Sequence, residues 1–227
     1  MKKLRIAVDG PSGAGKSELA KALARELGCI YVDTGALYRA VGLNAARLGL
    51  SKDDGAGIAA SLEGLRVSIK RQEGEQRIFI GDEDVSGLIR TPDISAWASV
   101  VSALPQVRAF LGGLQRDAAA RGNVIMDGRD IGTVIMPDAD VKIFLTARAE
   151  VRAERRRKQD MDRGRTDVPP LEEYLCEMQE RDSRDSRREH APAVAAADAA
   201  VLDNSDIDFE HTVEEALGII RERTAGK

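Results

Sequence analysis

The apolar residues of this 227-residue chain form short runs, separated by stretches in which they recur every three or four positions. Short runs bounded by polar turns predict buried strands, whereas repeats such as Leu19, Leu23 and Leu27 predict amphipathic helices. The predicted strands lie at residues 4–8, 29–32, 123–127, 141–145 and 201–202. Strands that alternate with helices predict an α/β fold, in which a parallel five-stranded sheet carries helices on both faces.

Residues 65–85 follow a different pattern. Apolar and polar residues alternate at 65–70 and again at 77–80, and the turn between them contains Gly74. Alternation with period two predicts a small antiparallel β insert. We therefore predict a single domain over 1–227. Its predicted parts are a core of residues 1–62, 91–154 and 171–227, a β insert at about 63–90, and a charged, mobile lid segment at about 155–170.

The junction between the first strand and the first helix has the spacing G-x-x-x-x-G-K-[ST]. Its residues are Gly10, Pro11, Ser12, Gly13, Ala14, Gly15, Lys16 and Ser17. Between a strand and a helix this spacing predicts a P-loop, whose backbone N–H groups surround the phosphates of a nucleoside triphosphate. We expect Lys16 to reach the β- and γ-phosphates and the Ser17 hydroxyl to bind Mg²⁺. The alternative is a glycine-rich turn that binds no ligand. Such a turn does not require the full G-x-x-x-x-G-K-[ST] motif, which this chain has.

Composition limits the compartment and the partners. The chain is 43% hydrophobic and 32% charged, and no apolar run approaches the ~20 residues that span a membrane. The first predicted strand leaves no room for a signal peptide. Neither Cys29 nor Cys176 has metal-ligand spacing, so we expect both to be buried core residues in a reducing cytoplasm. A net charge of −4 argues against a nucleic-acid partner, and the lack of a spare apolar helix face favours a monomer.

Arginines are nevertheless concentrated in two segments. They are Arg152, Arg155, Arg156, Arg157, Arg163 and Arg165, followed by Arg181, Arg184, Arg187 and Arg188. In an acidic chain such clusters predict a site for a small polyanion. In the helix after residue 171, an apolar stripe that includes Tyr174 and Met178 continues as Arg181, Asp185 and Arg188. A helix that merely emerges into solvent gives the same pattern, so this alternative stays open.

A P-loop occurs in ATPases, GTPase switches and kinases, and other features must separate them. The chain has no Asn/Thr-Lys-x-Asp stretch for reading guanine. Transfer to a small anionic acceptor suits the arginine clusters. An acceptor phosphate is already ionised, so the main task is to neutralise charge: two unit charges ~4 Å apart repel by roughly 4 kcal/mol at an effective dielectric of 20.

Several ordered motifs resemble those of bacterial cytidylate kinases, the (d)CMP kinases of the nucleoside monophosphate kinase family. They are Val8-Asp9-Gly10-Pro11-Ser12-Gly13-Ala14-Gly15-Lys16, Asp33-Thr34-Gly35-Ala36-Leu37-Tyr38-Arg39, residues 81–90 with Asp84-Val85-Ser86-Gly87, Asp127-Gly128-Arg129-Asp130-Ile131-Gly132-Thr133, and Glu180-Arg181-Asp182-Ser183-Arg184-Asp185. The resemblance covers nearly the whole chain. It implies a P-loop NTPase-type fold and phosphoryl transfer from ATP, with Mg²⁺, to CMP or dCMP.

The same resemblance implies roles for single residues. Arg39, Arg129 and Arg188 would hold the CMP phosphate, with Thr34 nearby; Ser99, Arg108 and Asp130 would read the cytosine edge; Arg181 and Asp185 would contact the sugar. Lys16, Arg129, Arg155, Arg156 and Arg188 would act in catalysis, with Arg155 and Arg156 belonging to the lid over ATP. An Asp or Ser acceptor beside an Arg donor matches the donor and acceptor pattern of cytosine.

Some of these residues have simpler interpretations. Arg39 is also typical of a surface arginine on a helix, Asp130 of a residue that caps a local turn, and Asp127 of a structural carboxylate at the end of a strand. Two rival functions stay open at this level. One is a kinase for another nucleoside monophosphate or small metabolite; the other is a nucleotide-dependent RNA-binding or regulatory module.

Overall fold

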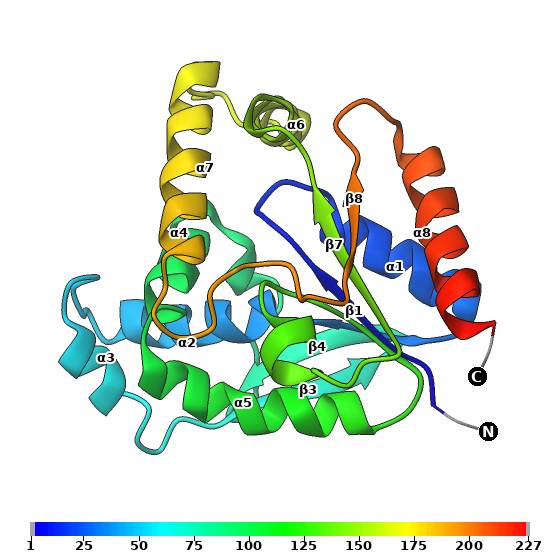
Figure 1. Cartoon of the computed structure of the whole chain (residues 1–227). Coiled ribbons are helices and arrows are strands. Elements are labelled where there is room, and N and C mark those ends of the chain that lie inside the picture. Colours follow the sequence, from blue (N-terminus) through cyan, green and yellow to red (C-terminus); the bar gives the residue numbers. More distant parts are fainter. Residues whose placement is uncertain (1–2, 226–227) are drawn as a thin grey trace. The chain divides into compact units, whose positions relative to one another are not determined.

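The computed structural model describes residues 3–225, and its central feature is a five-stranded sheet in the order β2-β6-β1-β7-β8 (Figure 1). The strands are β1 (Arg5–Asp9), β2 (Ile30–Asp33), β6 (Val124–Asp127), β7 (Val141–Thr146) and β8 (Ala200–Asp203). β1 pairs in parallel with both β6 and β7, and β7 pairs in parallel with β8. The predicted α/β class and all five predicted strands are confirmed, within one or two residues at their ends.

The described chain divides into two compact units. The first unit comprises residues 3–30 and 122–225, and the second comprises residues 31–121. Besides most of the sheet, the first unit contains α1 (Lys16–Leu27), the π-helical turn η2 (Ile131–Ile135), α6 (Ala149–Asp162), α7 (Leu171–Ser186) and α8 (Phe209–Thr224).

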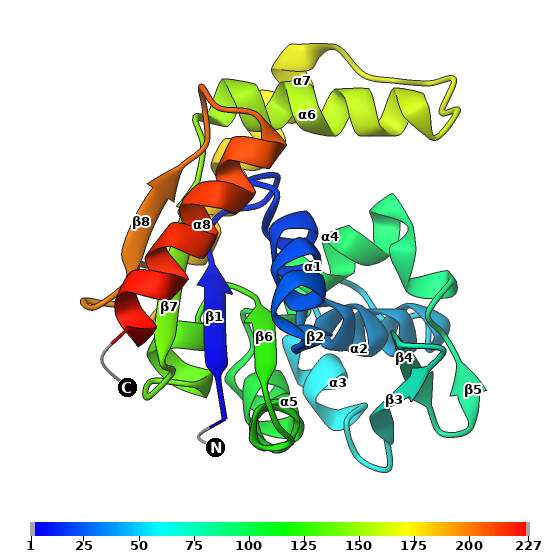
Figure 2. The same cartoon turned by 90° about the vertical axis from the view of Figure 1, so that its right-hand side faces the viewer.

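Burial in the first unit explains why its strands are nearly continuous apolar runs. Ile6, Ala7 and Val8 of the central strand β1 have no solvent exposure, because strands lie on both sides of β1 and helices cover its faces. α1 and α8 lie against each other on one face of the sheet (Figure 2). α6 and α7 form a separate pair, joined by the buried residues Ala153, Tyr174 and Met178.

The second unit contains the predicted β insert. Its elements are α2 (Gly35–Arg47), α3 (Gly55–Ala60), β3 (Val67–Gln72), β4 (Glu75–Ile80), β5 (Glu83–Asp84), the 3₁₀ turn η1 (Leu88–Arg90), α4 (Pro92–Val101) and α5 (Pro105–Ala120). β3, β4 and β5 form an antiparallel sheet, as predicted. Ile78 of β4 shares one hydrophobic core with Val41 of α2, Trp97 of α4 and Leu111 of α5. The insert therefore belongs to the same core as the helices that flank it in sequence.

α6 ends at Asp162, inside the segment of residues 155–170 that the sequence predicted to be a lid. Near this end the buried carboxylate of Asp160 accepts hydrogen bonds from the Tyr174 hydroxyl (2.9 Å) and from Arg165 (3.2 Å). One expectation from the sequence is wrong. Cys176 is exposed on α7 and is not a core residue, whereas Cys29 is buried as expected. The polar loop after β6 contains the turn η2, which no periodic pattern had indicated.

No single helix in the described part of the chain is long and apolar enough to span a membrane; α4 and α5 reach that length and hydropathy only as a pair bent by 101°.

Candidate active site

The P-loop follows β1 directly, and its glycines have backbone conformations that other residues rarely adopt. Gly10, Gly13 and Gly15 have φ angles of 143°, 78° and 92°. A Cβ atom on Gly10 would lie 1.9 Å from the carbonyl oxygen of Leu145 in β7, which no real side chain tolerates. Gly10 is therefore required by the close approach of two neighbouring strands.

Lys16 is buried at the first position of α1, and its Nζ donates a 2.6 Å hydrogen bond to the carbonyl oxygen of Pro11. Burial lowers the pKa of this ammonium group well below its ordinary value, and the positive charges of Arg129 and Arg181 lower it further. Asp127 and Asp9 act in the opposite direction. Lys16, Arg129 and Arg181 thus provide cationic groups near the loop, which a polyphosphate can pair with.

Ser17 and Asp127 face each other next to Lys16. The Ser17 hydroxyl donates a 2.6 Å hydrogen bond to Oδ2 of Asp127, at the end of β6. A hydroxyl and a carboxylate oxygen at this separation fit Mg²⁺, which prefers oxygen ligands and takes its remaining ligands from water and phosphate. No group of three or more His, Cys, Asp or Glu side chains that could hold a metal occurs among residues 3–225, so the protein would supply only part of the coordination shell.

Asp9 is a functional candidate that residue-by-residue reasoning did not identify. Its buried carboxylate accepts hydrogen bonds from the backbone N–H groups of Ile131 (2.8 Å) and Gly132 (2.7 Å), at the start of η2. Asp130 occupies the N-cap position of η2, but its side chain makes no capping hydrogen bond. The simpler interpretation of Asp130 as a turn cap therefore does not hold, because Asp9 performs that task from β1.

Burial raises the pKa of Asp9 from 3.8 to about 6, against the lowering effect of its two backbone hydrogen bonds. Between these pH values the folded protein keeps a proton that the unfolded chain has lost. The stability contributed by this group is thus fully present below about pH 4 and is lost as the pH rises through about 6. We predict that wild type loses about 2–3 kcal/mol relative to Asp9→Asn between about pH 4 and about pH 7. Urea unfolding of both proteins across this range measures the difference; a constant difference would contradict the raised pKa.

Asp185 is shared by two of the predicted phosphate-binding arginines. Its Oδ2 accepts a 3.2 Å hydrogen bond from Nε of Arg129, and its Oδ1 accepts a hydrogen bond from Nη2 of Arg188. The carboxylate is buried, and the side chain of Arg188 is only 8% exposed. The structure thus brings together Arg129, Asp185 and Arg188 from two distant segments of the sequence, and Asp185 holds both guanidinium groups in place.

Arg155 is held beside the P-loop by Asn204, a residue that sequence reasoning missed. Two nitrogens of Arg155 donate to Asn204, one to its side-chain oxygen (2.9 Å) and one to its carbonyl oxygen (2.8 Å). The buried side chain of Asn204 in turn donates to the carbonyl oxygen of Ala14 (3.1 Å). Arg156, one position along α6, donates instead to Gln159 (2.9 Å). No local pattern marks Asn204, because its partners are about 50 and 190 residues away.

In the second unit, Arg39 has a defined partner. Its Nη2 donates a 2.7 Å hydrogen bond to Oδ2 of Asp33, whose other carboxylate oxygen accepts from the backbone N–H of Ala36 (2.9 Å). The side chain of Gln76 in β4 both donates to and accepts from the backbone of Asp33. Arg39 is therefore an anchored side chain and not a solvated surface arginine; Thr34 beside it is buried.

Ser99 and Arg108 also lie in the second unit. Ser99 is buried on α4, and its hydroxyl oxygen has no hydrogen-bond partner among the described residues. Arg108 on α5 donates to the carbonyl oxygen of Ser102 (3.3 Å) and lies 5.8 Å from the centre of the Tyr38 ring. A buried hydroxyl without a partner is costly, which suits a group that bonds to a ligand.

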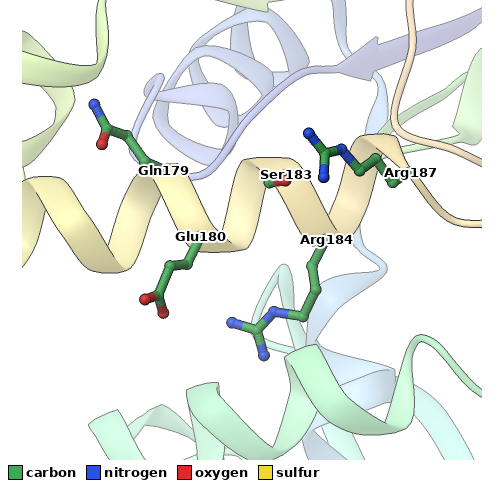
Figure 3. A pocket seen from close by; sticks show the side chains of 5 residues that line it. All are labelled: Gln179, Glu180, Ser183, Arg184 and Arg187. Atoms are coloured by element: carbon green, nitrogen blue, oxygen red, sulfur yellow. The ribbon is translucent and has the colours of Figure 1, made fainter.

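Arg184 of α7 and Arg187, which follows the end of this helix, line an open hollow of about 730 Å³, shown in Figure 3. Its lining residues are Gln179, Glu180, Ser183, Arg184 and Arg187. None of them is a predicted site residue. Arg181 and Asp185 also belong to α7, and Arg188 follows the end of this helix.

Comparisons with known proteins agree with these observations. The family model described as Cytidylate kinase matches residues 6–222. The cytidylate kinase of Ligilactobacillus salivarius (strain UCC118) is 45% identical over 98% of this chain and 99% of its own, and that of Exiguobacterium sp. (strain ATCC BAA-1283 / AT1b) is 43% identical over 97% and 98%. Among solved structures, shikimate kinase from Bacteroides thetaiotaomicron has a TM-score of 0.51 at 14% identity, covering 97% of this chain and 98% of its own. A gluconokinase from Sinorhizobium meliloti 1021 has a TM-score of 0.51 at 17% identity, covering 99% and 95%. These two structures support the P-loop kinase fold alone.

Proposed function

We propose how the side chains of this chain perform the reaction of its family. The chain belongs to the cytidylate kinase family and transfers a phosphoryl group from ATP to CMP or dCMP. In the proposal, one set of residues binds the triphosphate of ATP and another set binds the monophosphate. The observation that carries the proposal is the gathering of Lys16, Ser17 and Asp127 at the P-loop, within the electrostatic field of Arg129 and Arg181.

The triphosphate site is formed by residues 10–17. Their backbone N–H groups bind the phosphates of ATP, and Lys16 follows the transferring phosphoryl group. The Ser17 hydroxyl and the Asp127 carboxylate hold Mg²⁺, which neutralises phosphate charge when bound. Bound phosphates would raise the pKa of Lys16, which burial and the positive charges of Arg129 and Arg181 lower in the free protein.

We assign Arg129 and Arg188 of the first unit to the phosphate of CMP, and we assign Arg39 and Thr34 of the second unit to the same phosphate. An ionised phosphate oxygen attacks without a general base, so these guanidinium groups act by orienting the acceptor and by neutralising charge. The ion pairs to Asp33 and Asp185 support this role, because they fix the arginines before substrate arrives. Arg155 and Arg156, at the start of the proposed lid, stabilise the transferring group from the ATP side.

Ser99, Arg108 and Asp130 read the cytosine edge, and Arg181 and Asp185 contact the sugar. The unpartnered hydroxyl of Ser99 supports the first assignment. Asp185 retains acceptor capacity for a sugar hydroxyl, because a carboxylate offers about four lone-pair positions and the two arginines use only some of them.

We predict that Asp130→Ala relaxes the choice of base. Cytosine presents an N4 amino donor where uracil presents an acceptor, so removal of a carboxylate acceptor costs CMP about 1–3 kcal/mol and costs UMP nothing. The ratio of kcat/KM for CMP to that for UMP should therefore fall about tenfold or more. Steady-state assays with both nucleotides measure this ratio. An unchanged ratio would exclude Asp130 from base reading.

The overall function is tested by ADP release from ATP with CMP, dCMP, UMP and AMP as acceptors, with Mg²⁺ and with a chelator. We expect turnover with CMP and dCMP only when Mg²⁺ is present. Equal turnover with AMP would support a kinase of another specificity. Tight RNA binding that falls steeply with salt, without CMP phosphorylation, would support the regulatory alternative. We further propose that the enzyme acts in the cytoplasm as a monomer, without nucleic-acid or membrane partners.

A further inference from the structure

Arg152 of α6 lies where three segments of the first unit meet. Its Nε donates to the carbonyl oxygen of Ala147, just after β7 (2.8 Å), and its Nη1 donates to the carbonyl oxygen of Ser12 in the P-loop (3.0 Å). Its Nη2 donates to Oδ2 of Asp182 on α7 (2.6 Å). The side chain is only 5% exposed, so a single buried guanidinium group connects the sheet, the triphosphate loop and α7.

A second contact places both helices directly against the loop. A Cβ atom on Gly13 would lie 3.1 Å from Cβ of Arg152 and 3.1 Å from Cε of Met178. The loop backbone is therefore packed closely between α6 and α7, and a methyl group at Gly13 would require these side chains to move by a few tenths of an ångström. A shift of α7 relative to the P-loop would break this packing and the hydrogen bonds of Arg152 together.

Asp182 stands on the same helix as the residues assigned to CMP. Arg181 precedes it, and Asp185 lies three residues further along α7 and holds Arg188. The ion pair between Arg152 and Asp182 thus fixes this end of α7 to the carbonyl oxygen of a P-loop residue. Phosphoryl transfer is sensitive to the distance between donor and acceptor, and a misplacement of about 1 Å can cost about 10²-fold in rate.

We propose that Arg152 and Asp182 form a positioning pair, which holds the CMP-binding residues of α7 in register with the triphosphate loop. The pair touches neither substrate and acts through Ser12 and α7. This inference rests on the assignment of Arg181, Asp185 and Arg188 to CMP in the proposed function.

A nearby ion pair provides a matched control. Arg148, at the N-terminus of α6, forms a two-pronged pair with Asp206 (2.7 and 2.6 Å). This pair is exposed, with 52% and 77% of the two side chains accessible, and within residues 3–225 neither of its side chains forms a hydrogen bond to the P-loop. Asp206→Asn therefore removes the same chemical pair, from the same helix, without the proposed connection.

The experiment measures KM for CMP, KM for ATP and kcat of Asp182→Asn, Arg152→Lys and Asp206→Asn, together with their melting temperatures. We expect Asp182→Asn to raise KM for CMP and to lower kcat, with kcat/KM for CMP falling about tenfold. KM for ATP should change by less than about twofold, because Arg152 still bonds to Ser12. Arg152→Lys should have a larger effect, since an ammonium group cannot form the guanidinium's three directed bonds. Asp206→Asn should resemble wild type.

A purely structural role gives a different result. Lower stability reduces the fraction of active enzyme and the melting temperature, but it leaves KM for CMP unchanged. If Asp182→Asn lowers the melting temperature but leaves KM for CMP unchanged, the proposal is overturned. This test remains valid even if Arg152→Lys does not fold. Arg188→Ala separates this failure from a failure of the proposed function. If Arg188→Ala also leaves KM for CMP unchanged, the assignment of α7 to CMP is wrong; if only Arg188→Ala raises it, the positioning role is wrong.

Discussion

Replacing Lys16 with alanine is expected to lower kcat for CMP phosphorylation by about 10²–10³-fold while the protein remains folded. Lys16 is buried near Arg129 and Arg181, and in the described part of the chain its side chain donates one hydrogen bond, to the carbonyl oxygen of Pro11. Its charge therefore contributes little to the stability of the free protein. Its value lies in the transition state, where negative charge develops on the transferring phosphoryl oxygens in a site that excludes water.

Steady-state turnover and thermal unfolding of Lys16→Ala test this prediction. Lys21→Ala is the matched control, because Lys21 lies on the exposed side of the same helix. We expect the control to keep kcat within about twofold of wild type. A small change in kcat for Lys16→Ala, or a collapse of the melting temperature that accounts for the lost activity, would contradict the assigned role.

Arg188→Ala is expected to lower kcat/KM for CMP by about 10³-fold, an effect of the size that arginines exert in phosphoryl transfer. The substitution removes a positive charge from the proposed CMP phosphate site. It also frees Oδ1 of Asp185, while Oδ2 still accepts from Arg129. Because Asp185 keeps one cationic partner, we expect the stability loss to be only about 1–2 kcal/mol, far less than the loss in activity.

Arg187→Ala provides the comparison, since Arg187 directly precedes Arg188 in the sequence and lines the open hollow (Figure 3). Kinetics with CMP and urea unfolding should be measured for both variants. We expect Arg187→Ala to change kcat/KM by less than about threefold. Equal losses in the two variants would show that the effect is one of general charge and not of a specific phosphate contact.

The P-loop, the five parallel strands and the β insert could all be predicted from the order of the amino acids. These features follow from local rules: glycines at positive φ, apolar runs in strands that are buried on both faces, and period-two alternation in an antiparallel hairpin. Each rule acts over at most about ten neighbouring residues, so its effect can be recognised in the amino-acid sequence. The same holds for Lys16 and Ser17, whose spacing within the loop is itself the signal.

Which side chains become partners at the site is visible only in the folded protein. Asp9 reaches η2 across 122 residues, Arg152 reaches Ser12 across 140, and Asn204 reaches Ala14 across 190. Parallel strands joined by long crossovers bring such segments to one edge of the sheet, and no local pattern records the pairing. Asp185 shows the consequence. In the sequence Asp185 is one of several carboxylates on a charged helix. In the folded protein it is buried, and a buried carboxylate is stable only when cations pair with it. Arg129 and Arg188 are these cations.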